Sequence, residues 1–293
     1  MIIGPHRVGP DISPAALAVL IGHPDFDNAM IGVARRLVDE YRASWLMHRI
    51  LSDRGRMVAA YMALDLYFTD PARRGFTLAQ LRLEAERHGF ASRGRMTAWT
   101  ASLRVLGMLA PGAPGRPQRL VPTLKYLAMF RTRMDDFYQC IGLIHPVAGF
   151  NHAALERDGF VADLAAGFAE PYHSGQRILE ATPELATLAD REAGVILLMS
   201  IKLKEVAGEA ITIADLAREF IISRAHVRSV LHDASALGLV ARPMNDGVYL
   251  ALPRLTDSLR RLFAVMFQAH IFALERAMAG DTDIAAAAAP DAR

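Results

Sequence analysis

The chain has 293 residues, of which 52% are hydrophobic and 22% are charged, and its formal net charge is +2. This length predicts two ordinary domains, and the composition is that of a globular protein, which excludes a disordered or fibrous chain. A single cysteine, Cys140, excludes an internal disulfide. No Cys or Cys/His spacing typical of zinc is present, so we expect neither a metal nor another cofactor.

The sequence also lacks an obvious membrane or export signal. The apolar stretch 193–201 is much shorter than the roughly 18 to 20 residues that a spanning helix needs. The N-terminus has no apolar core of a signal peptide. We therefore expect a cytoplasmic protein without a membrane partner.

Residues 1–51 are predicted to form an arm followed by packing or dimerisation helices. Ser13 and Pro14 offer an N-cap and a first helical position for a short helix through Ile21. A second helix should begin near Asp27. Apolar residues recur in it at every fourth position, namely Val33, Leu37, Tyr41 and Trp45. Such a stripe needs a partner surface, and a homodimer through these helices is one way to supply it.

An internal repeat with an offset of 131 residues covers most of the remaining chain. Residues 91–124 align with 222–255 without a gap, and identical residues stand where local structure is expected to change. Serine opens a helix in both copies, Leu-Gly closes it, and proline opens the next helix. Upstream, residues 76–81 match 211–216, where each copy reads as an extended residue, an N-cap threonine and a helix.

Each copy therefore reads as helix, short extended segment, helix, turn, helix, strand, turn, strand and helix, which is the order of a winged helix. The turn of the second hairpin contains Asn245-Asp246-Gly247, a strong reverse-turn signal. The first hairpin has three prolines in its turn, so its strands should be short. The fold class we predict is mainly α with short β-hairpin wings, as tandem winged-helix (helix-turn-helix) domains joined by helical segments.

The two units resemble the winged-helix DNA-binding domains of MarR-type bacterial transcription regulators. On this resemblance, residues 52–147 form the first winged-helix domain, 148–188 a helical linker, 189–278 the second domain and 279–293 a flexible tail. In that family the third helix of each unit enters the major groove of DNA and the wing touches the flanking backbone. The resemblance implies DNA contacts from both third helices and both wings: Ser92, Arg93, Arg95, Thr97, Arg116, Arg119, Ser223, Arg224, His226, Arg228, Arg242 and Asn245.

These residue types suit double-stranded DNA. Arginine can grip a phosphate or pair with guanine, and serine, threonine and histidine supply shorter polar contacts. The alternative is that Arg93 and Arg224 are solvated surface residues on helices that only pack. Because exposed residues differ between the copies, as in Thr97 against Arg228, we predict two unequal half-sites. The sequence thus predicts a sequence-specific transcription regulator and not an enzyme.

Other chemistry finds less support in the sequence. His145, His152 and His173 have neither an i, i+4 spacing nor a zinc-hydrolase signature, and Cys140 reads as a packing residue. A set of aromatic and methionine residues reads as core, although it could line a pocket for a small-molecule effector between the DNA-binding units and the linking helices. The residues of this set are Tyr126, Met129, Phe130, Met134, Phe137, Tyr138, Phe150, Phe160, Phe168 and Tyr172. A protein–protein scaffold and a plasmid replication initiator stay open as other roles of tandem winged helices.

Overall fold

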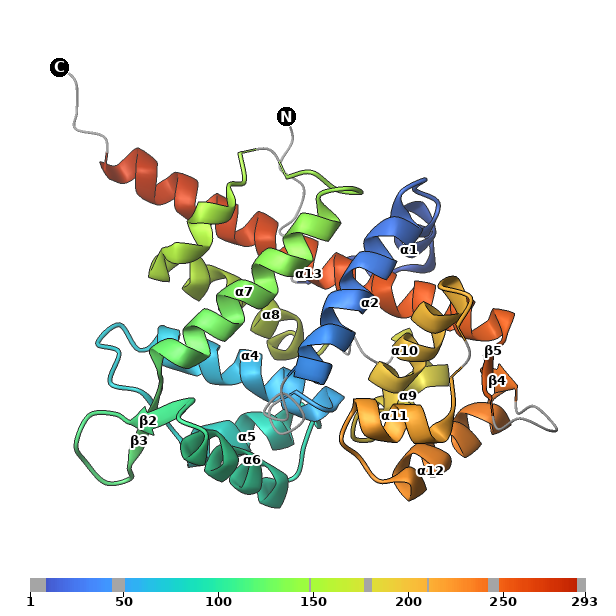
Figure 1. Cartoon of the computed structure of the whole chain (residues 1–293). Coiled ribbons are helices and arrows are strands. Elements are labelled where there is room, and N and C mark those ends of the chain that lie inside the picture. Colours follow the sequence, from blue (N-terminus) through green and yellow to red (C-terminus); the bar gives the residue numbers. More distant parts are fainter. Residues whose placement is uncertain are drawn as a thin grey trace. The chain divides into compact units, whose positions relative to one another are not determined.

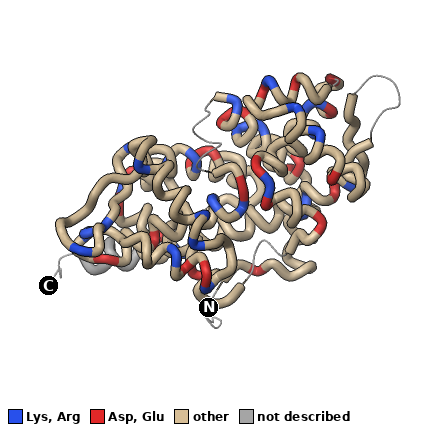
Figure 2. Tube along the Cα trace, turned by 90° about the horizontal axis from the view of Figure 1, so that it is seen from below, with Lys and Arg blue, Asp and Glu red and all other residues tan. Residues whose placement is uncertain are grey.

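The computed structural model describes residues 9–43, 51–147, 149–176, 181–209, 211–241 and 248–288. The fold is mainly helical with small antiparallel sheets (Figure 1). Acidic and basic residues are interspersed along the chain and do not gather in one long stretch of a single sign over the part described (Figure 2). The helices and small sheets confirm the predicted class, which is mainly α with short hairpins.

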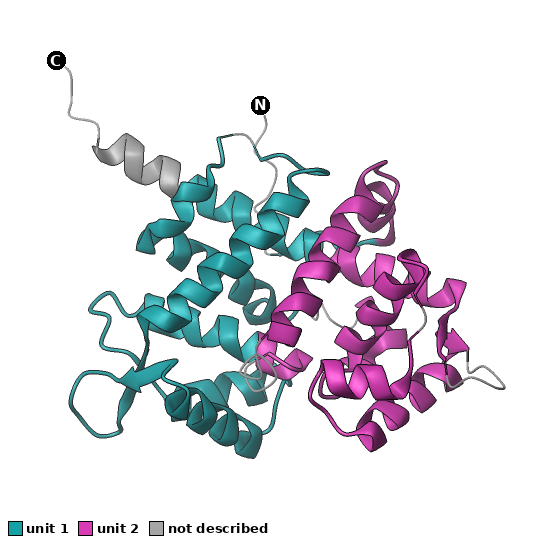
Figure 3. Ribbon diagram, viewed as in Figure 1, with its two compact units in different colours: residues 1–13, 58–178, 266–293 teal, residues 14–57, 179–265 magenta. Residues whose placement is uncertain are grey.

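The chain forms two compact units, each of which contains one copy of the repeat (Figure 3). Unit 1 consists of residues 1–13, 58–178 and 266–293, and unit 2 consists of residues 14–57 and 179–265. The N-terminal helices thus belong to the unit of the second repeat. The long helix α13 (Pro253–Ala288) contributes to both units.

Unit 1 follows the predicted order of elements. Its elements are α4 (Arg54–Thr69, from residue 58), β1 (Phe76–Thr77), α5 (Leu78–Arg87), α6 (Arg93–Val105), β2 (Leu109–Pro111), β3 (Arg119–Pro122), α7 (Leu124–Ile141), the 3-10 helix η1 (His152–Glu156), α8 (Asp158–His173) and α13 from residue 266. The strands pair antiparallel in the order β1-β3-β2, with Phe76 opposite Leu120 and Ala110 opposite Val121. The hairpin strands are short, as the prolines of the turn predict.

Unit 2 repeats this order behind three additional helices, α1 (Pro14–Ile21), α2 (Phe26–Ala43) and α9 (Pro183–Ala189). Its other elements are α10 (Gly194–Val206), α11 (Ile213–Glu219), α12 (Arg224–Ala236), β4 (Val240–Ala241), β5 (Leu250–Ala251) and α13 to residue 265. An isolated bridge between Thr212 and Val248 stands where unit 1 has β1 paired with β3.

The helix starts form where the sequence predicts them, because capping side chains satisfy the first free N–H groups. Thr77 and Thr212 form capping boxes with Gln80 and Asp215 three residues later. Ser92 caps α6 by accepting the N–H of Arg95 at 3.3 Å. Ser223 caps α12 in the same way, and it accepts the N–H of His226 at 3.1 Å.

The apolar stripe of α2 is buried within unit 2, where α2 packs against α10. Val33, Leu37 and Tyr41 are each less than 5% exposed. Trp45, the fourth residue of the stripe, lies outside the described residues. The partner surface that this stripe needs is therefore supplied by the chain itself, and a homodimer would have to use other residues.

Two segments differ from their sequence-based description. The predicted linker 148–188 contains α8, whose Phe160, Leu164 and Phe168 belong to the core of unit 1. The predicted tail 279–293 is helical as far as Ala288, because alanine has the highest helix propensity and lets α13 continue. Residues 253–280 of α13 are long and apolar enough to cross a membrane, but 56% of that apolar window is buried inside the protein, as in a core helix.

Candidate nucleic-acid interface

Helix α12 of unit 2 presents one packed face and one basic face. Val227, Val230, Leu231 and Ala234 are fully buried and form the inner face. Arg224, Arg228 and His232 follow one another at four-residue spacing and therefore share the outer face, where all three are exposed. We call these three residues the α12 basic stripe.

The side chains of the α12 basic stripe are available to a ligand. None of the three forms a hydrogen bond or an ion pair with another residue in the described part of the chain. Between them, Ser229 accepts a hydrogen bond from Arg191 at 2.8 Å, and Arg191 also pairs with Asp233. The one acidic side chain of this helix is thus neutralised by a neighbouring arginine.

Other predicted contacts on this helix are partly used inside unit 2. His226 bonds through Nε2 to the carbonyl oxygen of Glu192 at 2.8 Å. The hydroxyl of Ser223 serves as the helix cap. Their predicted DNA contacts would require these bonds to be shared or broken, which the basic stripe does not require.

In unit 1, the equivalent helix α6 is less available. Arg93 donates to Glu86 of α5 at 2.5 Å, and the Glu86 carboxylate raises the pKa of the Arg93 guanidinium. Thr97 donates to the carbonyl oxygen of Arg93 at 2.8 Å and accepts hydrogen bonds from Arg82. Arg95 is half-buried and has interactions of its own. At the positions equivalent to the α12 basic stripe, α6 has Arg93, Thr97 and Ala101, so only one is basic.

The two predicted wing arginines of unit 1 differ in their surroundings. Arg116 is exposed in the turn between β2 and β3, next to Pro117, with which it forms a cis peptide bond. Arg119 instead donates to the carbonyl oxygen of Gly75 at 2.6 Å and lies 3.9 Å from a carboxylate oxygen of Asp70. Arg119 therefore holds β3 against the start of β1, and Arg116 is the one of the two arginines that faces solvent. Arg242 and Asn245, the predicted contacts of the second wing, lie outside the described residues.

Sequence reasoning missed the residues that determine which arginines are free. Glu86, Arg82 and Arg191 all act on residues 7 to 42 positions away in the chain. Helical periodicity places a side chain on a face but does not identify its partner on another helix. The exposed face of α12 was predictable, whereas the internal bonds of Arg93 and Thr97 were not.

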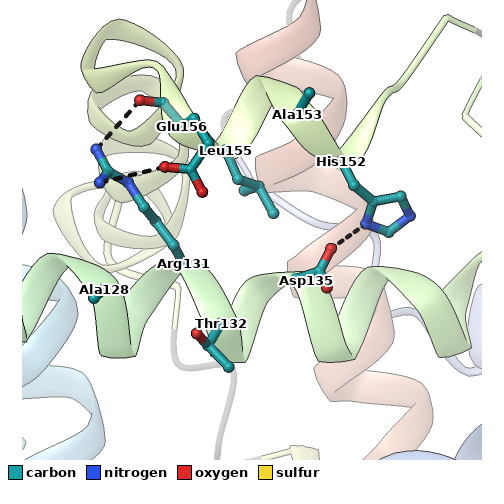
Figure 4. Close-up of a pocket in the computed structure, with 8 residues that line it drawn as sticks. All are labelled: Ala128, Arg131, Thr132, Asp135, His152, Ala153, Leu155 and Glu156. Carbon is teal, nitrogen blue, oxygen red and sulfur yellow. Dashed lines mark hydrogen bonds and ion pairs between the residues drawn. The ribbon is translucent and has the colours of Figure 1, made fainter.

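The three histidines singled out in the sequence do not meet. His145 pairs with Glu275 at 3.1 Å, and His152 pairs with Asp135. His173 lies beside Asp65, whose pKa is raised by burial, and beside Glu84 and His88. His152 and Asp135, with Arg131 and Glu156, line an open hollow of about 420 Å³ between α7 and η1 (Figure 4).

The aromatic residues considered as a pocket lining are mostly core residues of unit 1. Tyr61 stacks on Phe168 with ring centroids 4.4 Å apart, and Tyr126 donates its hydroxyl to the carbonyl oxygen of Ala60 at 3.0 Å. Burial raises the pKa of both Tyr126 and Tyr138. Cys140 is buried, as predicted. None of these aromatic residues lines the hollow of Figure 4, so they offer no support for an effector site there.

His270 of α13 is buried in the same core. Its ring stacks on Phe137 with centroids 4.2 Å apart and meets the ring of Phe168 edge-on at 4.9 Å. Its Nδ1 lies 2.7 Å from the carbonyl oxygen of Met266, and its Nε2 has no hydrogen-bond partner in the described structure. Burial, together with the nearby Arg133, lowers the pKa of His270 to about 3. The imidazole is therefore neutral in the folded protein.

Scans against models of known families, curated proteins and solved structures found no match. The candidate interface therefore rests on the geometry described above.

Proposed function

We propose that the protein is a sequence-specific double-stranded DNA-binding transcription regulator built from two winged-helix units of the MarR type. The observation that carries the proposal is the α12 basic stripe on the outer face of a helix that follows a short helix and a tight turn. A major groove about 12 Å wide accepts one such helix. Arginine side chains on that face can contact phosphates or guanine edges.

The order and pairing of the elements support this proposal. In each unit a capped helix precedes the candidate recognition helix, and a two-stranded hairpin follows it. In unit 1 the strand β1 directly precedes α5, and it pairs with the hairpin in the order β1-β3-β2. A winged helix places its wing beside the recognition helix by this arrangement, and Arg116 would then be a backbone contact.

The units are expected to contribute unequally. Unit 2 offers Arg224 and Arg228 on one helix face, neither of which has a partner among the described residues, whereas in unit 1 Arg93 is bound to Glu86. Exposed ion pairs are weak, so a phosphate could displace Glu86 from Arg93. We therefore assign the stronger contribution to α12 and a weaker one to α6, which also makes the two half-sites unequal.

The net charge of +2 makes local contacts decisive. Protein–DNA affinity depends on the number of phosphates neutralised, and each neutralised phosphate steepens the salt dependence. A protein with this charge gains little from its overall field. Removal of one or two arginines from the α12 basic stripe should consequently have a large effect.

The test is recovery of DNA fragments from the genome of the native host by the purified full-length protein. We expect a limited set of promoter-proximal fragments for the wild type and few or none for a variant with Arg224→Ala and Arg228→Ala. Arg261→Ala removes an exposed arginine of the same unit outside α12 and should leave recovery unchanged. Enrichment of a replication origin would favour an initiator, and no enrichment by any form would favour a protein–protein scaffold.

A further inference from the structure

Four ionisable side chains of unit 1 gather where α4, the C-terminal end of α5 and the end of α8 meet. Asp65 lies on α4, Glu84 lies on α5 four residues before the C-cap residue His88, and His173 is the last residue of α8. The Oε2 atom of Glu84 is 3.0 Å from Nε2 of His88 and 3.7 Å from Nδ1 of His173. The other ring nitrogen of His173, Nε2, is 3.3 Å from Oδ2 of Asp65.

The cluster is largely enclosed but has one open side. The side chains of Glu84 and His88 are 11% and 7% exposed, whereas that of His173 is 41% exposed. Enclosed ligands lose little freedom when an ion binds, and the exposed side allows entry from solvent. The arrangement is thus partly preformed and accessible.

We propose that Glu84, His88 and His173 bind a divalent first-row transition-metal ion, with zinc as the reference ion. The three ligand atoms lie within 4.8 Å of one another. Two ligands of a tetrahedral zinc ion, each at about 2.0 to 2.1 Å from the metal, are roughly 3.4 Å apart. The separations of 3.0 and 3.7 Å between Glu84 and the two histidines lie on either side of that value.

Asp65 completes the site as a positioning residue. When Nδ1 of His173 coordinates the ion, its Nε2–H donates to Asp65, which fixes the tautomer and the orientation of the ring. A carboxylate behind a metal-bound histidine is a recurrent feature of zinc sites. The remaining coordination position would belong to solvent at the open side.

The ligand set also selects the class of ion. Two imidazole nitrogens and one carboxylate oxygen suit zinc, nickel or ferrous iron, whereas magnesium and calcium prefer sites made of oxygen atoms only. The histidine–carboxylate pairs His145–Glu275 and His152–Asp135 were not found to have a third ligand atom nearby among the described residues. They are therefore natural controls for simple surface binding.

The experiment uses the full-length protein, freed of metal by a chelator and with any histidine tag removed. Zinc is titrated against a chromogenic chelator that competes for it, and cobalt is titrated in parallel because its visible spectrum reports coordination geometry. We expect one zinc ion per chain and tetrahedral or five-coordinate cobalt bands. His88→Ala and His173→Ala should abolish both signals, and His152→Ala should leave both unchanged.

Asp65→Asn separates positioning from ligation. We expect it to weaken zinc binding by about 10- to 100-fold while the stoichiometry stays at one. Circular dichroism shows whether each variant is folded, and Glu84→Gln provides a second ligand variant if an alanine variant is not. The proposal is overturned if zinc binds the wild type and both histidine variants equally, or if it does not bind the wild type. Because neither measurement involves DNA, the outcome is independent of the proposed function.

Discussion

Mildly acidic pH should lower the stability of unit 1, because His270 is protonated in the unfolded chain but stays neutral in the folded protein. In the unfolded chain this imidazole titrates near 6.5, but in the folded protein burial and Arg133 hold its pKa at about 3. A histidine whose folded pKa is lowered contributes stability that is fully present above the unfolded pKa. That stability is lost as the pH falls from 6.5 toward 3.

The size of the effect follows from the two pKa values. One pKa unit corresponds to about 1.4 kcal/mol. At pH 5, about 1.5 pH units below the unfolded pKa, protonation of this imidazole stabilises the unfolded chain by about 2 kcal/mol. The folded protein does not gain this free energy, because His270 stays neutral in it. Most domains have a total stability of only about 5 to 15 kcal/mol.

The assay compares urea unfolding of His270 and His270→Phe proteins at pH 8 and pH 5. Both carry Trp45→Phe, so that the buried Trp99 reports on unit 1. Phenylalanine can keep the stacking on Phe137 and does not titrate. We expect the protein with His270 to lose about 2 kcal/mol more than the variant between the two pH values.

Other titrating groups cancel in this difference, because both proteins retain them. Equal losses in the two proteins would refute the reasoning. If the variant does not fold, nuclear magnetic resonance titration of the His270 ring gives the same information, and a midpoint near 6.5 would refute the lowered pKa.

Three further predictions concern α6, its ion pair and the metal site. Gly94→Ala should raise stability by about 0.5 to 1 kcal/mol, because an added Cβ meets open space at this helical position, and Gly159→Ala at the equivalent position of α8 should do the same. Urea unfolding measures the stability of both variants. Only Gly94→Ala should weaken DNA binding, since of α6 and α8 only α6 would approach the DNA backbone. Glu86→Gln should strengthen DNA binding a few-fold in fluorescence anisotropy by releasing Arg93, and weaker binding would contradict that role of the pair. Zinc at 100 times its dissociation constant should stabilise unit 1 by about 2.7 kcal/mol but not stabilise His88→Ala, and equal stabilisation of both in thermal unfolding would exclude the site.

The order of elements could be predicted from the sequence because capping and turn residues act locally. Thr77, Thr212, Ser92 and Ser223 form the predicted caps, and the apolar faces of α6 and α12 are buried as periodicity indicates. The division into units was not predictable in this way. It depends on α2 packing against α10 and on α13 contributing to both units, which are contacts between segments far apart in the chain.

In the candidate sites, too, local features could be predicted from the sequence, whereas contacts between helices could not. The exposed position of Arg224 follows from its place in the helix, but the capture of Arg93 by Glu86 depends on how α5 packs on α6. Histidine–histidine and cysteine spacings do not reveal the proposed metal cluster. Glu84 and His88 have the i, i+4 spacing of a helical ligand pair, and His173 joins them only through the packing of α8.

The salt dependence of DNA affinity tests the central proposal most directly. Fluorescence anisotropy with a duplex recovered from the host genome would give the affinity of the wild type, Arg224→Ala, Arg228→Ala and the Arg261→Ala control at several salt concentrations. We expect each α12 substitution to weaken binding and to flatten the plot of log affinity against log salt by about 1, with the control unchanged. Wild-type affinity and slope in both α12 variants would contradict the account.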